Sequence, residues 1–404
     1  FVVDEDETLW LSYFGGVFEI NNPITSDYAI YQYLENNPNV NFSLIKVNSL
    51  FIDKFKNLWI STGSRGIYYR SLSPTPFHYL SNSKFRTTGF ATNEISSIAA
   101  GKNNALWMIV ESGSLFHYDI TNEKWELIPL SVSKGAADGL QTLTLSANEQ
   151  KLYIGLSTGL IVYDIKSKTS RWLIGGQSRT IPYAPSISRI KEDKWGRLWI
   201  CSWGKGVYCI KDIDSTPSII YYLTPWAQHP IKSNYITELY IDNNSLLLGT
   251  TQGLNKVWLN ENGEIKNISA YQANDSISKS MSSNYIACID QQNDSIYWIG
   301  TIGGGVNQIT IHSPHDNDYS AACYTEHNGL TSNDSEIIYL DKKQNVWIGG
   351  KGITQIHAET NHIYVYDSQN HSFKIGAGCK AKDGTIYMGS TSGLCYFQPA
   401  ELDV

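Results

Sequence analysis

The stretch DKWGRLWICSWGKGVYCI, residues 193–210, combines an acidic turn, an alternating aromatic run and a glycine pair. DKWG favours a tight turn, because Asp bonds its own backbone and Gly accepts unusual torsion angles. RLWICS predicts a strand, and WGKG predicts a hairpin turn that needs positive φ. Whether Asp193, Trp199 and Trp203 form a binding cluster or a structural unit depends on whether the chain repeats them.

The chain repeats this pattern nine times. The aromatic anchors of the copies, spaced 49, 48, 46, 46, 48, 51, 49 and 40 residues apart, are Trp10, Trp59, Trp107, Tyr153, Trp199, Leu247 (where Leu replaces the aromatic), Trp298, Trp347 and Tyr387. A period in the forties that joins a turn, an aromatic strand and a Gly-bearing hairpin is typical of β-propeller blades. The sequence therefore predicts an all-β propeller.

Four strands are expected within one copy. ISRIKED (187–193), RLWICS, VYCIKD and SIIYYLT (218–224) supply them in order. The aromatic residue of the second strand should pack between neighbouring sheets, where it buries a large area. The prediction is that Trp59, Trp199, Trp298 and Trp347 are buried in this way.

Most of the quoted stretch is assigned to this scaffold, because Asp193, Trp199 and the two glycines Gly204 and Gly206 have equivalents in other copies. Trp203 has no such equivalent. Other hairpins carry small residues in its place, such as Gly, Ser or Thr. The sequence leaves open whether Trp203 belongs to the scaffold or to a binding site.

Composition limits the possible partners. The 404-residue chain has a net charge of −7 and no run of Lys or Arg, which argues against binding to nucleic acid or to an anionic membrane surface. No run of eighteen apolar residues is present, so no membrane span is expected. No signal peptide is visible and Phe1 lies within a repeat, from which we expect a piece of a longer protein.

The six cysteines show no CxxC spacing, so neither a zinc site nor any other cofactor is expected. Cys201 and Cys209 flank one hairpin symmetrically. A cross-strand disulfide in an oxidising compartment and two buried free thiols both fit this spacing, and free thiols are the simpler interpretation.

The repeat I-x-x-I-x-x-D-x-x-G-x-L-W-I-x-T-x-x-x-G-I/V/L-x-x-Y resembles the two-component-regulator propeller repeat. The resemblance covers all nine copies, from Asp4 to Pro399, although the copies at Gly101, Asn148, Asp242 and Asn293 depart from it at the turn. It implies the periplasmic sensor region of a hybrid two-component system, with the histidine kinase elsewhere in an inner-membrane protein. It further implies an oligosaccharide ligand and a homodimer of the full-length protein, but no ligand-contacting motif to carry over.

The number of strands in the last copy predicts how the ring of blades closes. The last copy supplies three strands, and the isolated strand PFHYLS (76–81) would complete its blade and remove an exposed edge. Copies three to nine would then form a seven-bladed ring over residues 76–404. Residues 1–75 would be the last two blades of a preceding propeller. A single eight- or nine-bladed ring is the alternative.

Three functional hypotheses compete: a ligand-binding sensor, a protein-interaction scaffold and an enzyme. Propeller sialidases need an arginine cluster, whereas the arginines here share no blade position. Lyase-like propellers need a catalytic histidine, and His229, His312, His315 and His327 have no evident acid or base partner. We therefore expect no catalysis in this region, and the fold alone does not choose between the other two.

The ligand face is predicted from blade geometry. Hairpins between second and third strands lie on the same rim as the links between blades, so the hairpin of Trp203 and Lys205 should face two long links, 173–186 and 222–235. The side chains expected to converge with them are Arg179, Tyr183, Trp226 and His229. Flat aromatic faces and fixed polar groups suit a sugar. The alternative is that both tryptophans merely pack loops against the rim.

Overall fold

The computed structural model describes residues 1–404 except 5–7, 14–15, 22–28, 33–45, 55–56, 65, 72–76, 81–93, 103–104, 111–112, 131–138, 176–184, 275, 277–278 and 403–404. The chain forms two compact units, Phe1–Pro76 and Phe77–Val404. Regular structure in the described residues is β-strand apart from two short 3-10 helices, Glu326–Asn328 and Pro399–Leu402. A helix with the length and hydropathy of a membrane span is absent from them.

The first unit consists of two antiparallel sheets. One holds β1 (Val2–Val3), β2 (Leu9–Tyr13), β3 (Gly16–Asn21) and β4 (Ala29–Gln32), and the other holds β5 (Val47–Ile52), β6 (Asn57–Thr62) and β7 (Ile67–Ser71). Trp10 is buried against Leu58 and Ile60 between these sheets. Trp59 is 38% exposed, so its predicted burial is wrong. It alternates with Leu58 and Ile60, and no third described sheet of this unit covers its face of β6.

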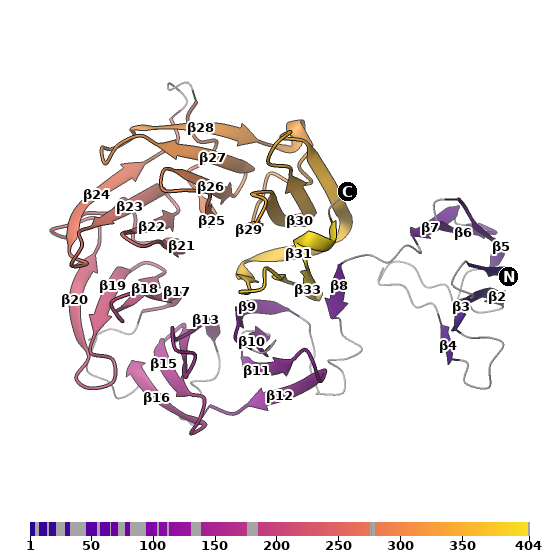
Figure 1. Cartoon of the computed structure of the whole chain (residues 1–404), viewed down its shortest axis with the longest axis horizontal. Coiled ribbons are helices and arrows are strands. Elements are labelled where there is room, and N and C mark those ends of the chain that lie inside the picture. Colours follow the sequence, from indigo (N-terminus) through magenta and orange to yellow (C-terminus); the bar gives the residue numbers. More distant parts are fainter. Residues whose placement is uncertain are drawn as a thin grey trace. The chain divides into compact units, whose positions relative to one another are not determined.

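The second unit contains five four-stranded antiparallel sheets (Figure 1). They run from β9 (Ile95–Ala100) to β12 (Lys124–Ile128), β13 (Leu140–Leu145) to β16 (Thr169–Ile174), β17 (Ile187–Glu192) to β20 (Ser218–Leu223), β21 (Ile236–Ile241) to β24 (Ile265–Tyr271) and β25 (Ile286–Gln291) to β28 (Tyr319–Tyr324). Their middle strands are β10 (Ala105–Val110), β11 (Ser114–Asp119), β14 (Lys151–Leu156), β15 (Gly159–Asp164), β18 (Leu198–Ser202), β19 (Gly206–Lys211), β22 (Ser245–Thr250), β23 (Gly253–Leu259), β26 (Ile296–Thr301) and β27 (Val306–Ile311). The four strands expected for the quoted copy are confirmed as β17–β20.

The last two blades share one six-stranded sheet. Its order is β29 (Ile337–Leu340), β30 (Val346–Ile356), β31 (Ile363–Lys380), β32 (Ile386–Ser390), β33 (Gly393–Phe397) and β8 (His78–Leu80). β30 pairs with β29 through its first residues and with β31 through its last. β31 in turn pairs with β30 at its start and with β32 at its end, so one strand serves both blades.

The ring closes through β8, which pairs with β33 so that Tyr79 lies opposite Cys395. Phe77, just before β8, packs on Phe397 with ring centroids 4.8 Å apart. The predicted pairing of this strand with the last copy is therefore confirmed. The inner strands β9, β13, β17, β21, β25, β29 and β31 contact one another in that order, and β31 contacts β9. Among the described residues, this makes a seven-bladed β-propeller (Figure 1).

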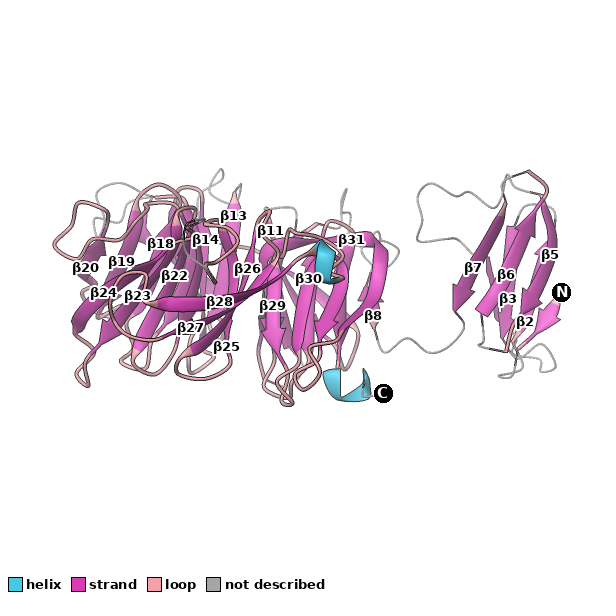
Figure 2. Ribbon diagram, turned by 90° about the horizontal axis from the view of Figure 1, so that it is seen from above, coloured by secondary structure: helices cyan, strands magenta, loops and turns pink. Residues whose placement is uncertain are grey.

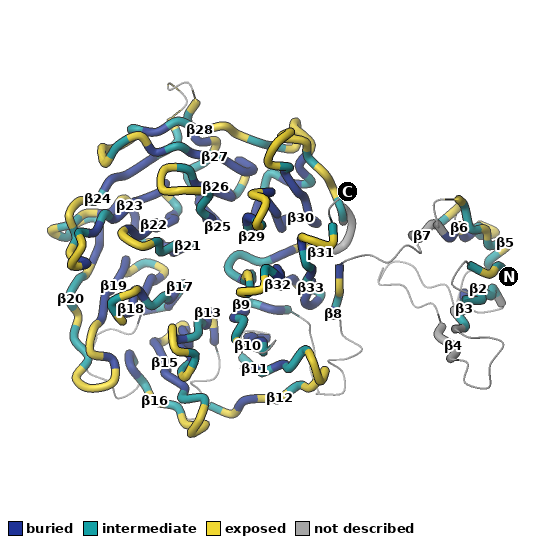
Figure 3. Tube along the Cα trace, in the orientation of Figure 1, coloured by how far each residue is buried: buried dark blue, intermediate teal, exposed yellow. Residues whose placement is uncertain are grey.

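Loops gather on the two faces of the ring, between which the strands run (Figure 2). Buried residues follow the strands, and exposed residues lie mainly in the loops (Figure 3). The face that carries the hairpins between second and third strands is called the hairpin face below. The opposite face, which carries the turns between first and second strands, is called the turn face.

A recurring side-chain clasp explains the repeat. Six residues before the anchor tryptophan, an aspartate accepts a hydrogen bond from its indole N–H: Trp199 Nε1 donates to Asp193 Oδ2 at 2.8 Å and Trp347 Nε1 to Asp341 Oδ2 at 3.0 Å. Trp298 uses Gln292 instead, at 2.9 Å. These three tryptophans are buried, as predicted. The clasp fixes the turn and the aromatic in one unit, which places Asp193 in the scaffold.

The strand register also settles the relation between the two hairpin cysteines. Cys201 lies opposite Val207, and Cys209 lies opposite Trp199. The two thiols are thus diagonal rather than directly facing. Both are buried and free. Burial raises the pKa of each thiol well above its ordinary value, so both stay protonated.

Candidate functional site

The hairpin between β18 and β19 lies between two links of the hairpin face. The Trp203 N–H donates to the Ser186 carbonyl at 2.9 Å, and the Gly204 and Gly206 N–H groups donate to the Asn234 carbonyl at 3.0 and 3.1 Å. Ser186 ends the link that precedes this blade, and Asn234 belongs to the link that follows it. The hairpin therefore faces both links, as blade geometry predicted.

Glycine is required at the base of this hairpin. Gly206 has φ of 78°, in the left-handed region that favours glycine. A Cβ there would collide with the Leu223 carbonyl at the end of β20. The hairpin is thus pressed directly against the start of the following link.

Trp203 forms an aromatic pair with Tyr235. The ring centroids lie 5.2 Å apart in an edge-to-face arrangement, and the two backbones form an isolated antiparallel bridge. Trp203 is 47% exposed and Tyr235 is 45% exposed, so both rings also face solvent. Sequence reasoning did not select Tyr235. Two features of the sequence could have pointed to it: Tyr235 ends a long link, and it belongs to the segment SNY, which recurs at 283–285.

The link that carries Trp226 is tied down at its ends. At one end, the Trp226 N–H donates to Thr224 Oγ1 at 3.3 Å. At the other end, Ile231 is buried in the core and its N–H donates to the Thr224 carbonyl at 3.3 Å. Trp226 is 83% exposed. No ring contact between it and Trp203 is found in the described part of the chain.

The remaining predicted site residues contribute less. Lys205 is exposed at the tip of the hairpin, and its backbone N–H donates to Ser202 Oγ at 3.1 Å. His229 is half-buried in the middle of the link. Arg179 and Tyr183 lie outside the described residues. Trp203 and Tyr235 are thus the side chains that the structure brings together here.

The link that carries Trp226 also contains Asn234, whose side-chain oxygen is buried and accepts no hydrogen bond. The equivalent asparagines of two other blades do accept one. Asn284 Oδ1 accepts the Ala273 N–H at 2.7 Å, and Asn333 Oδ1 accepts the Glu326 N–H at 2.9 Å. Both donors lie two residues beyond the outer strand of their blade. At that position the blade formed by β17–β20, the third of the ring, has Pro225, which has no N–H. Asn234 Oδ1 is buried without a partner as a result.

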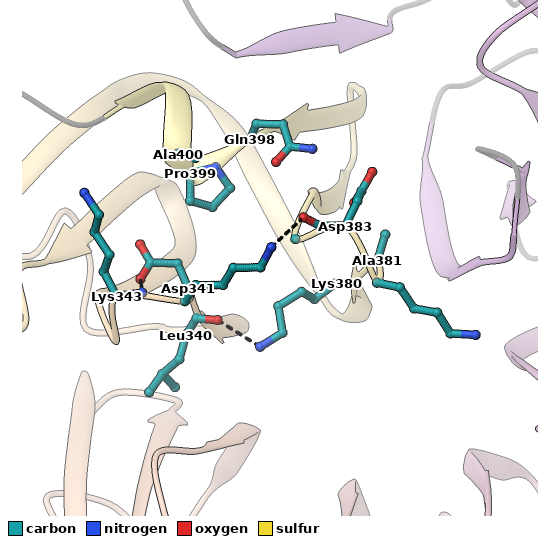
Figure 4. Close-up of a pocket in the computed structure, with 12 residues that line it drawn as sticks. Leu340, Asp341, Lys343, Lys380, Ala381, Asp383, Gln398, Pro399 and Ala400 are labelled. Atoms are coloured by element: carbon teal, nitrogen blue, oxygen red, sulfur yellow. Dashed lines mark hydrogen bonds between the residues drawn. The ribbon is translucent and has the colours of Figure 1, made fainter.

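A hollow lies on the turn face between the last two blades (Figure 4). Its volume is about 360 Å³, and four lysines line it: Lys342, Lys343, Lys380 and Lys382. Lys380 Nζ donates to the Leu340 carbonyl at 2.8 Å, and Lys342 Nζ to the Asp383 carbonyl at 3.4 Å. At least two of these ammonium groups therefore serve the backbone of neighbouring turns. No cluster of His, Cys, Asp or Glu able to hold a metal ion is found among the described residues.

Comparison with known proteins supports the fold. No family model matches the sequence. Histidine kinase P4 of Formosa agariphila is 22% identical over 334 residues, which cover 80% of this chain and 23% of that protein. The extracellular domain of the putative hybrid two-component system BT3049 from B. thetaiotaomicron superposes with a TM-score of 0.70 at 22% identity, covering 98% of this chain and 51% of that one. The chain thus spans less than two thirds of either protein.

A streptogramin B lyase structure also superposes, with a TM-score of 0.58 at 12% identity over 79% of this chain and 96% of that one. At these identities, similarity shows the β-propeller fold. The first two proteins are a histidine kinase and the extracellular domain of a putative hybrid two-component system, which agrees with the resemblance that the repeat residues indicated.

Proposed function

We propose that this chain is the extracytoplasmic sensor region of a hybrid two-component regulator, located in the periplasm and signalling to a histidine kinase in the same protein. The similarity to the BT3049 extracellular domain over 98% of the chain supports this proposal. The similarity to a histidine kinase supports it independently. In this proposal the first unit is the last pair of blades of a preceding propeller, and the full-length protein is a membrane-anchored homodimer.

The ligand proposed for this sensor is an oligosaccharide held on the hairpin face of the third blade. The observation that carries the proposal is the exposed edge-to-face pair of Trp203 and Tyr235. A large aromatic ring costs little conformational entropy on binding and offers a flat face to the C–H side of a sugar. Lys205, Trp226 and His229 lie between the two residues in the sequence, and the proposal assigns them as further aromatic and polar groups of the site.

A protein-interaction scaffold is the second candidate function, and Trp226 favours it. An indole that is 83% exposed is the kind of residue that dominates protein interfaces. Catalysis in this region is not proposed. The lyase similarity carries the fold alone, and the described residues offer no metal cluster.

The test is a glycan array on the full chain, followed by calorimetric titration of the best oligosaccharide. Trp203→Ala should weaken its binding at least about tenfold, which corresponds to about 1.4 kcal/mol. The melting temperature should hardly change, because half of the ring is already in water. Tyr364→Ala, at a tyrosine 42% exposed on another blade, is the matched control and should bind normally.

Unchanged affinity in Trp203→Ala would move the ligand away from this hairpin. A large drop in melting temperature with intact affinity would return Trp203 to the scaffold. Failure of all glycans, together with a protein partner whose binding is lost in Trp226→Ala, would favour the interaction scaffold.

A further inference from the structure

The axis of the ring contains a cavity of about 480 Å³, bordered by the seven inner strands. The strand registers define two levels of side chains along it. At the level of the anchor aromatics lie Ala99, Thr144, Lys191, Tyr240, Asp290, Tyr339 and Cys379. One level nearer the hairpin face lie Ser97, Thr142, Arg189, Glu238, Cys288 and Ile337.

On one side of the cavity, most polar groups are paired within the protein, although Arg189 Nη2 is buried without a hydrogen-bond partner. Arg189 Nε donates to Glu238 Oε2 at 3.0 Å, and Nη1 donates to the Ser188 carbonyl at 2.7 Å. The guanidinium reaches across the axis to β31, where a side chain at Gly376 would collide with it. Because glycine leaves this space, Arg189 crosses the channel near the hairpin face.

At the level of the anchor aromatics, nearer the turn face, the carboxylate of Asp290 is also paired within the protein. Asp290 Oδ2 accepts the Leu340 N–H at 2.7 Å and pairs with Lys380 Nζ at 3.3 Å. Lys380 also donates to the Leu340 carbonyl, as Figure 4 shows. These groups need no ligand.

The wall formed by β13 and β17 differs. Thr142, Thr144 and Lys191 line the cavity, and no hydrogen bond or ion pair to protein is found for their hydroxyl and ammonium groups in the described part of the chain. Thr144 and Lys191 lie at the same level on strands that contact each other. Lys191 Nζ lies 5.6 Å from the centroid of the Tyr240 ring. Two hydroxyl-bearing side chains and a cationic one thus line a common space.

The charge balance leaves this cation uncompensated. Glu238 neutralises Arg189, and Asp290 neutralises Lys380. Glu336 also borders the cavity, but burial raises the pKa of its carboxyl to about 7, so it is only partly ionised at neutral pH. An anion would therefore complete the electrostatics of this wall, because the half-buried Lys191 has no carboxylate partner in the described part of the chain and charges attract more strongly in a confined channel than in bulk water.

We propose that the channel binds a small hydroxylated carboxylate, with its carboxylate on Lys191 and Thr144 and a hydroxyl on Thr142. The cavity has room for a six-carbon molecule, and a charge-assisted hydrogen bond from the ammonium provides the anchor. Arg189 crosses the axis nearer the hairpin face, so the ligand enters from the turn face. This site is separate from the one at Trp203 and does not rest on the function proposed above.

The probe is gluconate, with glucitol as its uncharged counterpart, titrated calorimetrically into the full chain. Gluconate should bind and glucitol should bind at least about tenfold more weakly. Lys191→Gln keeps a polar side chain but removes the charge, and it should weaken gluconate binding by at least about tenfold. Thr144→Val should weaken it as well. Lys266→Gln, a matched change at an exposed lysine of β24, should leave it unchanged.

Equal affinities of the wild type and Lys191→Gln for gluconate would overturn the proposal, as would equal binding of gluconate and glucitol. Absence of gluconate binding in the wild type would also overturn it. Inorganic phosphate is the third arm: phosphate binding that is lost in Lys191→Gln, with no response to gluconate, would replace the carboxylate by a phosphate. Loss of gluconate binding in Trp203→Ala but not in Lys191→Gln would assign it to the hairpin face.

Discussion

Replacing Asp193 with Ala should destabilise the ring far more than the same change at the equivalent Asp341. Both carboxylates accept four hydrogen bonds, two from backbone N–H groups, one from the anchor tryptophan and one from the side chain four residues on. For Asp193 that last donor is the guanidinium of Arg197, at 2.7 Å. For Asp341 it is the neutral amide of Asn345, at 3.0 Å. The pair is thus matched except for one charge.

The magnitudes follow from burial. The Asp193 side chain is 1% exposed and that of Arg197 is 9% exposed, so Asp193→Ala leaves a buried cation without its counter-ion. Breaking a buried ion pair in this way costs about 3–5 kcal/mol. Asp341→Ala leaves neutral donors unpaired, which costs about 1–3 kcal/mol. Arg197 keeps its 2.7 Å bond to the Gly263 carbonyl, which holds the guanidinium in place after the change.

The assay is equilibrium urea denaturation followed by tryptophan fluorescence, with the double variant Asp193→Ala/Arg197→Met included. Removing the stranded guanidinium should make the double variant more stable than Asp193→Ala alone, which gives a measurable coupling energy. Equal losses for Asp193→Ala and Asp341→Ala would refute the reasoning. A double variant no more stable than the single one would refute it too.

Three further predictions concern burial, the unpaired amide and pH. Trp347→Ala should cost about 3–5 kcal/mol, whereas Trp59→Ala should cost about 1–2 kcal/mol because that ring is partly in water, as denaturation of the two variants can show. Asn284→Ala should cost about 1–3 kcal/mol by stranding a backbone N–H, whereas Asn234→Ala, which removes an unpaired acceptor, should cost less than about 0.5 kcal/mol; similar losses would contradict the assignment to Pro225. Burial raises the pKa of Glu336 from 4.5 to about 7, so the protonated carboxyl favours the folded state below pH 4.5 and this contribution is lost as pH rises through 7. Melting temperatures of Glu336→Gln and wild type should therefore diverge between pH 4.5 and 7 in favour of the variant, and a pH-independent difference would exclude this role.

Within a blade, the sequence alone was sufficient to predict the strands and the buried aromatic residue. Turn chemistry, alternation and the glycine hairpin are local, and each is repeated, so the strands β17–β20 and the burial of Trp199 followed from residues close in the chain. The scaffold role of Asp193 followed for the same reason, since its partner tryptophan lies six residues away. The closing strand β8 was also found, because a fourth strand was missing from the last copy and one unassigned strand remained.

What lies between blades was decided by the tertiary structure. Trp59 has the same local sequence as the buried anchors, yet its exposure depends on whether another sheet of its unit covers it. Tyr235 reaches Trp203 only because two blades meet at a hairpin. Asn234 Oδ1 has no donor because Pro225, nine residues earlier, lacks the N–H that other blades supply at this position. The two residues are related only through the folded link.

The central channel shows most clearly what only the tertiary structure decided. The repeat places side chains of the inner strands at successive levels of the axis, and nothing in the pattern predicts which groups will meet across it. Arg189 finds Glu238 on the next blade and Gly376 on β31, whereas no ion pair or hydrogen bond to protein is found for the Lys191 ammonium in the described part of the chain. The sequence by itself thus determined the blade, because its interactions are short-range. The ring determined the pairing of charges, because that depends on residues brought together from blades far apart in the chain.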